Sequence, residues 1–460
     1  MRSRLVAVAV LNVLVALSLG GAAGSASGAV ASTPFVTGKR PFLVGLEPGV
    51  VVRPVLTTGD VIGEGPGAYQ MSGVPDGIGW YAPVEGTIEV YLNHELHEEW
   101  DPSGARVSHV TLDAGGAVTA AEYVVDGTEG YEWFCSSTLE VIDGVPWYLT
   151  GEESKHSPRL GASIAIDLAT GTLHEMPWFG HFGHENVVPI GGLSRSMIGL
   201  SEDGFREYSQ LFVYLSRSFE GAIDGTEGSL RVWVPNRPVA DGNPSGNDLA
   251  KGEAMRGRFV RIPHAEDLLP LQLEKLVQSM GAFDFDRIED MVDDPNEPGV
   301  VYFAETGRAN QEVTHGRIYR LDVNPRHPEQ ATLSVVLDAA SGDDLVSPDN
   351  LGISDAALVI QEDRNWKGTG YNRVLVYDLA SGTLTAAART DPGAWIVDKH
   401  GPGAWESSGI VDASEAFGPG WWLLSVQAHY TKVPVPDQSL EPDSATGEGG
   451  QLLLVHIPGT

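Results

Sequence analysis

The stretch SIAIDLATGTLHEM, residues 163–176, has the pattern of two short strands around a tight turn. Apolar residues alternate up to Asp167, and Asp167 and Gly171 are typical of turns because Asp binds its own backbone and Gly allows left-handed dihedrals. Nearly the same sequence returns as RVLVYDLASGTLTAA at 373–387, and looser versions occupy 108–124 and 316–338. These stretches predict one type of hairpin repeated along the chain.

Recurrence of one hairpin predicts an all-β fold in which similar sheets are arranged radially, a β-propeller. The 56 glycines and 29 prolines are spread along the chain, as expected for many short strands and tight turns. The irregular spacing of the repeats does not set the number of blades, and a pair of β-sandwich sheets is the alternative. We also expect a small helical insertion at 264–281, because apolar residues there have helical spacing between Pro270 and Gly281.

The first 31 residues have the composition of a signal peptide. Arg2 and Arg4 precede an apolar stretch, and small residues end it at a predicted cleavage site, Ala29-Val30-Ala31. No basic stop-transfer segment follows, so cleavage is favoured over membrane anchoring. We therefore expect a secreted, extracellular protein with one propeller catalytic domain over residues 32–460.

The chain is strongly acidic, with 62 Asp and Glu residues against 29 Lys and Arg residues and a formal net charge of −33. This charge argues against nucleic acid or an anionic membrane as a partner. We expect a monomer that acts on a small molecule. Carboxylates in excess either form a solvated surface or bind hard cations such as Ca²⁺. The single cysteine, Cys135, excludes an internal disulfide.

Four strand-like runs end in two adjacent carboxylates. Strand ends from separate blades of a propeller converge on its central channel, where two unit charges about 4 Å apart repel by roughly 4 kcal/mol at an effective dielectric of about 20. The four pairs therefore predict a site that holds several cations. They are Glu152–Glu153 in VPWYLTGEES, Glu202–Asp203 in SMIGLSEDG, Glu289–Asp290 in FDFDRIEDM and Glu362–Asp363 in ALVIQEDRN.

Other strand ends add candidates to the same site. Glu95, Glu185, Glu305, Asp349 and Glu406 stand at comparable places. Cys135 lies one hairpin away from Glu152–Glu153, and its sulfur is too soft a ligand for Ca²⁺. A thiolate beside carboxylates predicts a mixed site with a transition metal. The histidine pairs His94/His97 and His181/His184 are more typical of core or supporting residues, since the helical HExxH pattern is absent.

Several motifs occur in the order found in one family, over about residues 90–430. The chain resembles the PhoX-type alkaline phosphatases, which are exported β-propeller enzymes. The resemblance implies a cofactor of two iron and three calcium ions, and hydrolysis of phosphate monoesters. The motifs are NHE (93–95), CSSTLE with WYLTGEES (135–154), GHFGHE (180–185), SED (201–203), RIED (287–290), SPDNL (347–351) and WESSGI with LLSVQAH (405–429).

The resemblance also implies roles for individual residues. Cys135 would bind iron, Glu289 would be a metal ligand, and Arg287 would bind the substrate phosphate as the catalytic arginine. His181 stands where the family has Arg, and Ile288 replaces the proline of its Arg-Pro-Glu-Asp motif. Six more residues would ligate Fe³⁺ or Ca²⁺, without assignment to either: Glu153, Glu185, Glu202, Asp349, Asp363 and Glu406.

Two other functions fit the acidic propeller. One is a calcium-dependent propeller lactonase or phosphotriesterase, which needs no cysteine at its metal. The other is a non-catalytic propeller that binds calcium for structure alone, where Arg287 beside an acidic site has no evident use. A dianionic ester would be repelled by the acidic chain unless cations invert the local field. Arg287 and bound metals together would supply that positive charge, so the phosphatase is favoured over the two alternatives.

Overall fold

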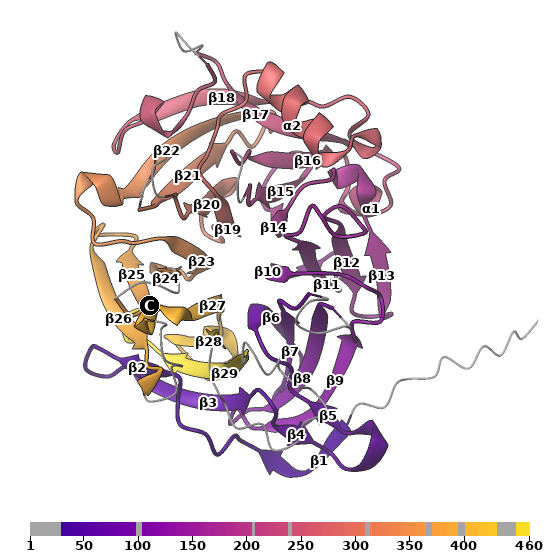
Figure 1. The fold of residues 1–460 in the computed structure, drawn as a ribbon, viewed down its shortest axis with the longest axis vertical. Helices are drawn as coiled ribbons and strands as arrows, with labels where there is room; N and C mark the ends of the chain where they lie inside the picture. Colours follow the sequence, from indigo (N-terminus) through magenta and orange to yellow (C-terminus); the bar gives the residue numbers. More distant parts are fainter. Residues whose placement is uncertain are drawn as a thin grey trace, which may run out of the picture.

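Antiparallel sheets radiate from a central axis (Figure 1), and their strands make up about half of the residues that the structure describes. The computed structural model describes residues 29–460 except for eight internal stretches. Those are 98–103, 205–207, 238–241, 309–312, 314, 365–369, 394–400 and 430–447. The predicted signal peptide lies outside the described residues up to position 28. Its predicted cleavage site coincides with the start of β1 (Ala29–Phe35), which pairs with the outer edge of the first sheet.

Six inner strands surround the axis, and each packs against the next until the last contacts the first. This closed ring makes the described part of the chain a six-bladed β-propeller, which confirms the predicted fold class and excludes the sandwich alternative. The strands are β6 (Pro75–Val84), β10 (Phe134–Ile142), β14 (His184–Ile190), β19 (Ile288–Asp293), β23 (Pro348–Ile353) and β27 (Trp405–Asp412).

Each blade is an antiparallel sheet that runs outward from its inner strand. The first adds β7 (Thr87–His94), β8 (Arg106–Asp113) and β9 (Val118–Val125); the second adds β11 (Val145–Glu152), β12 (Ser163–Asp167) and β13 (Thr172–Glu175). The third adds β15 (Ser196–Glu202), β16 (Phe212–Ser216) and β17 (Ser229–Pro235); the fourth adds β20 (Val300–Glu305), β21 (Arg317–Val323) and β22 (Gln330–Asp338). The fifth adds β24 (Ala357–Glu362), β25 (Arg373–Asp378), β26 (Leu384–Thr390) and β2 (Leu43–Gly45).

The sixth blade joins the two ends of the chain. Its strands are β27, β28 (Trp421–Ala428), β29 (Gly449–His456) and the N-terminal β3 (Val51–Thr57). β29 pairs with both β28 and β3, so closure comes from hydrogen bonds between the first and last parts of the propeller. A second irregularity is β18 (Ala254–Arg261), which pairs with β17 and β22 and fuses the third and fourth blades into one nine-stranded sheet. The short strands β4 (Val61–Ile62) and β5 (Tyr69–Gln70) form a separate ladder.

The repeated hairpin occupies the same place in four blades. Its copies are β12–β13, β25–β26, β8–β9 and β21–β22, the third and fourth strands outward from the axis. The two closest copies have matching turns: Asp167 Oδ1 accepts the Thr170 N–H, and Asp378 Oδ1 accepts the Ser381 N–H. Gly171 and Gly382 have φ of 72° and 71°, where a side chain would be strained.

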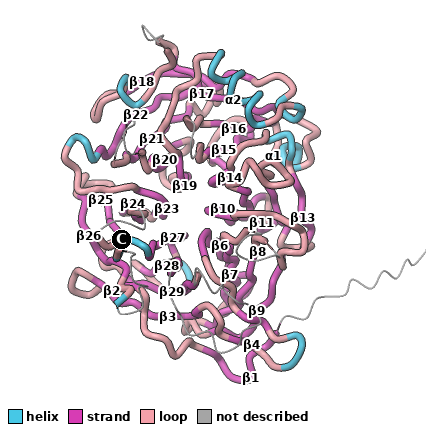
Figure 2. Tube along the Cα trace, in the orientation of Figure 1, coloured by secondary structure: helices cyan, strands magenta, loops and turns pink. Residues whose placement is uncertain are grey.

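The described residues contain the α-helices α1 (Phe219–Ile223), α2 (Pro270–Ser279) and α3 (Ser414–Phe417). Of these, α1 and α2 lie outside the ring of inner strands (Figure 2). α2 confirms the predicted helical insertion: Pro270 is its first residue, and Gly281 follows its end with φ of 76°. Its buried Leu273 and Val277 pack on the core of the third blade. None of the helices in the described stretches is long and apolar enough to span a membrane.

Candidate metal centre

One backbone hydrogen bond recurs at the same end of five blades. The carbonyl of the residue before the inner strand accepts the N–H of the residue after the second strand, which places the latter residue equivalently in each blade. The pairs, with N···O distances, are Val74–Glu95 (2.9 Å), Trp133–Glu153 (3.0 Å), Gly183–Asp203 (3.2 Å), Arg287–Thr306 (3.0 Å) and Ser347–Asp363 (2.9 Å).

The accepting residue is strained in four of these blades. Val74, Trp133, Arg287 and Ser347 have φ of 48°, 51°, 69° and 47°, a region that non-glycine residues seldom adopt. Such a conformation costs on the order of 1–3 kcal/mol and persists where surrounding contacts impose it, often at functional sites. The kink turns the chain sharply into the inner strand just before its second residue.

The second residue of every inner strand is a metal-ligating type: Asp76, Cys135, Glu185, Glu289, Asp349 and Glu406. The ladder with the second strand shifts register shortly after this position in all six blades, and such bulges re-aim side chains. We use the name central cluster for these six residues together with Glu95, Glu153, Asp203 and Asp363.

Possible ligand atoms of the central cluster converge in three triads, each within 4.8 Å: Asp76–Glu95–Cys135, Cys135–Glu153–Glu185 and Glu185–Glu289–Asp349. Cys135 belongs to two triads and Glu185 also belongs to two, so the triads form a connected chain. Such sharing is the arrangement expected where neighbouring ions are bridged by common ligands.

The adjacent carboxylates divide two tasks between them. Where a pair ends a second strand, its first carboxylate binds the backbone of nearby loops. Glu152 accepts the N–H groups of Glu132 and Ala162 at 2.9 and 2.8 Å, and Glu362 accepts the Val346 N–H at 2.9 Å. The second members, Glu153 and Asp363, belong to the central cluster. The order is reversed at Glu289–Asp290, because this pair lies at the start of an inner strand: Asp290 accepts the Leu351 N–H while Glu289 joins a triad.

Glu202, unlike the other predicted ligands, is the carboxylate of its pair that binds backbone and does not belong to the central cluster. Glu202 Oε2 accepts the Gln210 N–H at 2.9 Å, and the equivalent place in the cluster belongs to Asp203. The candidate list from the sequence omitted Asp203 and Asp76. The SED motif contains Asp203, but the sequence has no signal for which member of an acidic pair faces the axis. Asp76 stands alone after Pro75, with no preceding apolar run to mark a strand end.

Burial and mutual repulsion raise the pKa values of seven cluster carboxyls, those of Asp76, Glu95, Glu153, Glu185, Glu289, Asp349 and Asp363. Burial also acts on Glu406, but contact with His429 lowers the pKa of Glu406 overall. The pKa of Glu185 rises to about 8 and that of Glu95 to about 7, in each case mainly because of burial. Burial and the charge of Glu153 raise the pKa of the Cys135 thiol, whose Sγ donates to Glu153 Oε2 at 3.1 Å. Without cations, therefore, the cluster retains protons that bound metal ions would displace.

Two cationic side chains border the cluster. The Arg287 guanidinium contacts Asp203 Oδ2 at 2.7 Å and Glu289 Oε1 at 3.2 Å, yet 26% of its side chain is exposed. His429 lies between Glu448, at 2.6 Å, and Glu406, at 3.7 Å. Burial opposes its protonation, but the charges of Glu448 and Glu406 raise the pKa of His429 overall.

Neutral polar side chains next to the central cluster hold its carboxylates in place by hydrogen bonds. Ser136 Oγ donates to Glu185 Oε1 at 2.7 Å, and Asn350 Nδ2 donates to Ser136 Oγ at 2.9 Å. Asn350 also donates to Asp76 Oδ1 at 3.3 Å, so one amide of the fifth blade joins the first and second blades. The hydroxyl of Ser136 therefore supports Glu185.

His94 and His184 have structural positions. His94 is hydrogen-bonded to Gly73 O and Ser108 Oγ at 2.9 and 2.7 Å, and His184 Nε2 donates to Gly180 O at 3.1 Å. Burial lowers the pKa of each to about 3, so both are neutral. These contacts agree with the supporting role expected from their isolated positions on strands.

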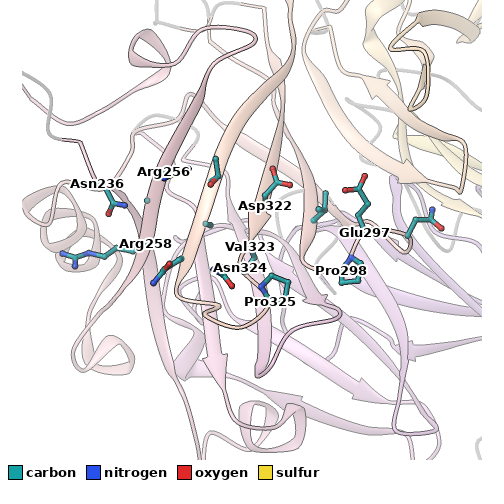
Figure 3. Close-up of a pocket in the computed structure, with 15 residues that line it drawn as sticks. Asn236, Arg256, Arg258, Glu297, Pro298, Asp322, Val323, Asn324 and Pro325 are labelled. Atoms are coloured by element: carbon teal, nitrogen blue, oxygen red, sulfur yellow. The ribbon is translucent and has the colours of Figure 1, made fainter.

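A cavity of about 1040 Å³ lies away from the central cluster. It is lined by outer strands of the third and fourth blades, with Arg256 and Arg258 facing Glu297 and Pro298 across it (Figure 3). None of the central cluster lines it.

No family model and no curated protein matches the chain. Solved structures do match. An α-L-arabinanase from Penicillium chrysogenum, complexed with arabinobiose, is 10% identical over 89% of this chain and 99% of its own, with a TM-score of 0.44. The β-propeller domain of the Trilobed protease from Pyrococcus furiosus is 9% identical over 76% of this chain and 89% of its own, with a TM-score of 0.33. Likenesses this weak say nothing about the activity of the chain.

Proposed function

We propose that this chain is a secreted, metal-dependent alkaline phosphatase that hydrolyses phosphate monoesters at a mixed Fe³⁺ and Ca²⁺ centre. One observation carries the proposal: a cysteine sulfur and buried carboxylates converge in connected triads, and a partly exposed arginine stands at their edge. The substrate would be a small-molecule ester, and the protein a monomer.

The donor set fits the proposed metals. Carboxylate oxygens suit Ca²⁺, while the sulfur of Cys135 suits a transition ion and not calcium. Cys135, Glu153 and Glu185 would bind one transition ion, and sharing of Cys135 and Glu185 would place further ions beside it. The remaining predicted ligands would complete the sites: Glu289, Asp349, Asp363 and Glu406. Glu95, a candidate from its place at a strand end, and Asp76, which the sequence did not mark, would join them.

Metal ions bound here would supply Lewis-acid polarisation of the ester and activation of water near neutral pH. The chain's own residues would position the substrate. Arg287 would donate to two phosphate oxygens through its planar fork. Asp203 would keep the guanidinium oriented, because it binds Nε and Nη2 together.

The negative charge of the chain makes the positive charge of Arg287 important for substrate binding. A monoester dianion approaching a chain of net charge −33 meets repulsion, and Arg287 is the cation that contacts the central cluster through Asp203 and Glu289. In hydrolysis, the oxygen of water bonds to phosphorus, the bond between phosphorus and the ester oxygen breaks, and the alcohol leaves with one proton from water. Arg287 would stabilise the charge on the transferring phosphoryl group.

The test measures metals and activity on one sample. The protein, purified without chelator, should contain both iron and calcium by inductively coupled plasma mass spectrometry and hydrolyse p-nitrophenyl phosphate at alkaline pH. Calcium alone, with hydrolysis of lactones or phosphotriesters, would instead establish the alternative enzyme. Calcium alone, with no hydrolysis, would leave a non-catalytic calcium-binding propeller.

A further inference from the structure

A second cavity, of about 350 Å³, lies between the second and third blades beneath the start of α2. Its walls come from the loop after β11, the segment before β14, the end of β15, the start of β16 and the N-terminal part of α2. Its size falls within the roughly 300–1,000 Å³ typical of small-molecule sites. It can therefore take an aromatic ring or a short alkyl group.

The cavity adjoins the central cluster along the chain at three points. Glu202, in its wall, immediately precedes Asp203. Phe182 immediately precedes Gly183, whose carbonyl accepts the Asp203 N–H at 3.2 Å. Lys155 lies two residues after Glu153. Because the ends of β11 and β15 contribute both to this wall and to the cluster, the cavity and the cluster lie at the same end of the second and third blades.

The lining of the cavity is mainly apolar. Phe182 stacks on Phe212, with ring centroids 4.5 Å apart, and Leu273 closes the space from α2. Leu269 and Leu271 also line it, although they are 54% and 60% exposed to solvent. Covering these two exposed leucines with a ligand would contribute about 25 cal/mol of favourable binding free energy for each Å² of apolar surface buried.

We infer that this cavity binds the alcohol side of the phosphate ester when that side is an aromatic or short alkyl group, while Arg287 binds the phosphate. The inference rests on the proposed function and adds its substrate class: esters of apolar alcohols are preferred over esters of polar alcohols such as glycerol. α2 is then the element that sets specificity, because its first turn supplies Leu269, Leu271 and Leu273 to the cavity.

The test compares 1-naphthyl phosphate with glycerol 2-phosphate on wild-type protein and on Leu271→Asp. The exposed position of Leu271 allows the change without unfolding, which a thermal melt verifies. We expect kcat/KM for the naphthyl ester to fall about tenfold, since each factor of ten corresponds to about 1.4 kcal/mol, and kcat/KM for the glycerol ester to change less than about twofold. Leu46→Asp, at a leucine 45% exposed and outside the cavity, is the matched control.

Binding of 1-naphthol, measured by calorimetry, separates failure of the inference from failure of the proposed function. If wild-type protein hydrolyses both esters and Leu271→Asp keeps the naphthyl preference, the inference is overturned and the phosphatase stands. If wild-type protein hydrolyses neither ester, the phosphatase is overturned. In that case, if wild-type protein binds 1-naphthol and Leu271→Asp does not, the cavity is supported as an apolar ligand site. If wild-type protein does not bind 1-naphthol, the cavity is not such a site.

Discussion

Asp203 binds the guanidinium of Arg287 through two nitrogens, with Nη2 2.7 Å and Nε 3.1 Å from Oδ2. The two residues come from neighbouring blades. Asp203 is buried while 26% of the Arg287 side chain is exposed, so the pair presents an oriented cation at the edge of the carboxylate cluster. Arg287 has a left-handed φ of 69°, a strained conformation that Val74, Trp133 and Ser347 adopt at the equivalent place in other blades.

Replacing Arg287 with Ala should lower kcat/KM for p-nitrophenyl phosphate by roughly a hundredfold or more, the usual effect of removing a donor to developing charge. Iron and calcium contents should remain. Arg287→Lys should recover only part of the loss, because a single ammonium lacks the planar fork. Arg320→Ala is the control, since Arg320 pairs with Glu297 and Asp322 away from the cluster. Unchanged kinetics in Arg287→Ala would remove the phosphate-binding assignment.

Asp203→Asn should lower kcat/KM by about tenfold, chiefly through a higher KM, because Arg287 loses its bidentate partner. Combined with Arg287→Ala, it should add little, since residues that act through one contact are not additive. The double-mutant cycle therefore measures whether Asp203 acts by positioning Arg287. Full additivity would assign Asp203 an independent role, such as metal ligation.

Cys135→Ser should reduce the iron content strongly and the calcium content little, because an oxygen replaces the one soft ligand of the triads. Mass spectrometry of the purified variant reads both metals. Ser137→Ala, two residues along the same strand and outside the triads, should keep both metals. Equal iron in Cys135→Ser and wild-type protein would contradict the thiolate site.

Removal of metals should lower the melting temperature by roughly 5 °C or more, because binding to the native state alone stabilises it. The loss should be larger at pH 9 than at pH 6. The pKa of Glu185 is raised to about 8 in the folded chain, above its ordinary value near 4.5. Protonation therefore stabilises the metal-free fold fully below about pH 4.5, and this contribution disappears as the pH rises through about 8.

The measurement is a thermal melt of chelated protein at both pH values, repeated after calcium and iron are restored. A chelated protein that melts at the same temperature at pH 6 and pH 9 would contradict repulsion among the cluster carboxylates as the source of instability.

Ser136→Ala should weaken metal retention or activity by roughly tenfold, the usual scale for a residue that orients a ligand. Ser136 Oγ donates to Glu185 Oε1 and accepts from Asn350, so its loss frees Glu185 to rotate. Ser136→Thr should restore much of the loss, because it keeps the hydroxyl. Ser381→Ala, on an exposed outer turn, is the control and should behave as wild type.

Local patterns were enough to predict the all-β class and the single helical insertion. The repeated Asp and Gly of the hairpin act within their own turns, as Asp167 and Gly171 show, so their effect is readable without the fold. The same holds for α2, where Pro270 begins the helix. The number of blades was not readable, because β18 and the closure of β29 on β3 join segments far apart in sequence.

The candidate site likewise contains some residues that the sequence predicted and others that only the structure identified. Cys135, Glu185 and Glu289 were predicted from their motifs, and the structure brings all three into the connected triads. Adjacent carboxylates such as Glu202 and Asp203 are chemically alike, so only the backbone direction at the strand end decides which one faces the axis.

By itself, then, the sequence determined the all-β class, the repeated hairpin and helix α2, together with the acidity of the strand ends and the presence of one soft ligand, because these follow from residue types acting on their immediate neighbours. Tertiary structure alone decided which carboxylates share the axis, how Asp203 orients Arg287 and where the apolar cavity meets the rim. Those relationships depend on distances between separate blades, which are set by the closure of the ring.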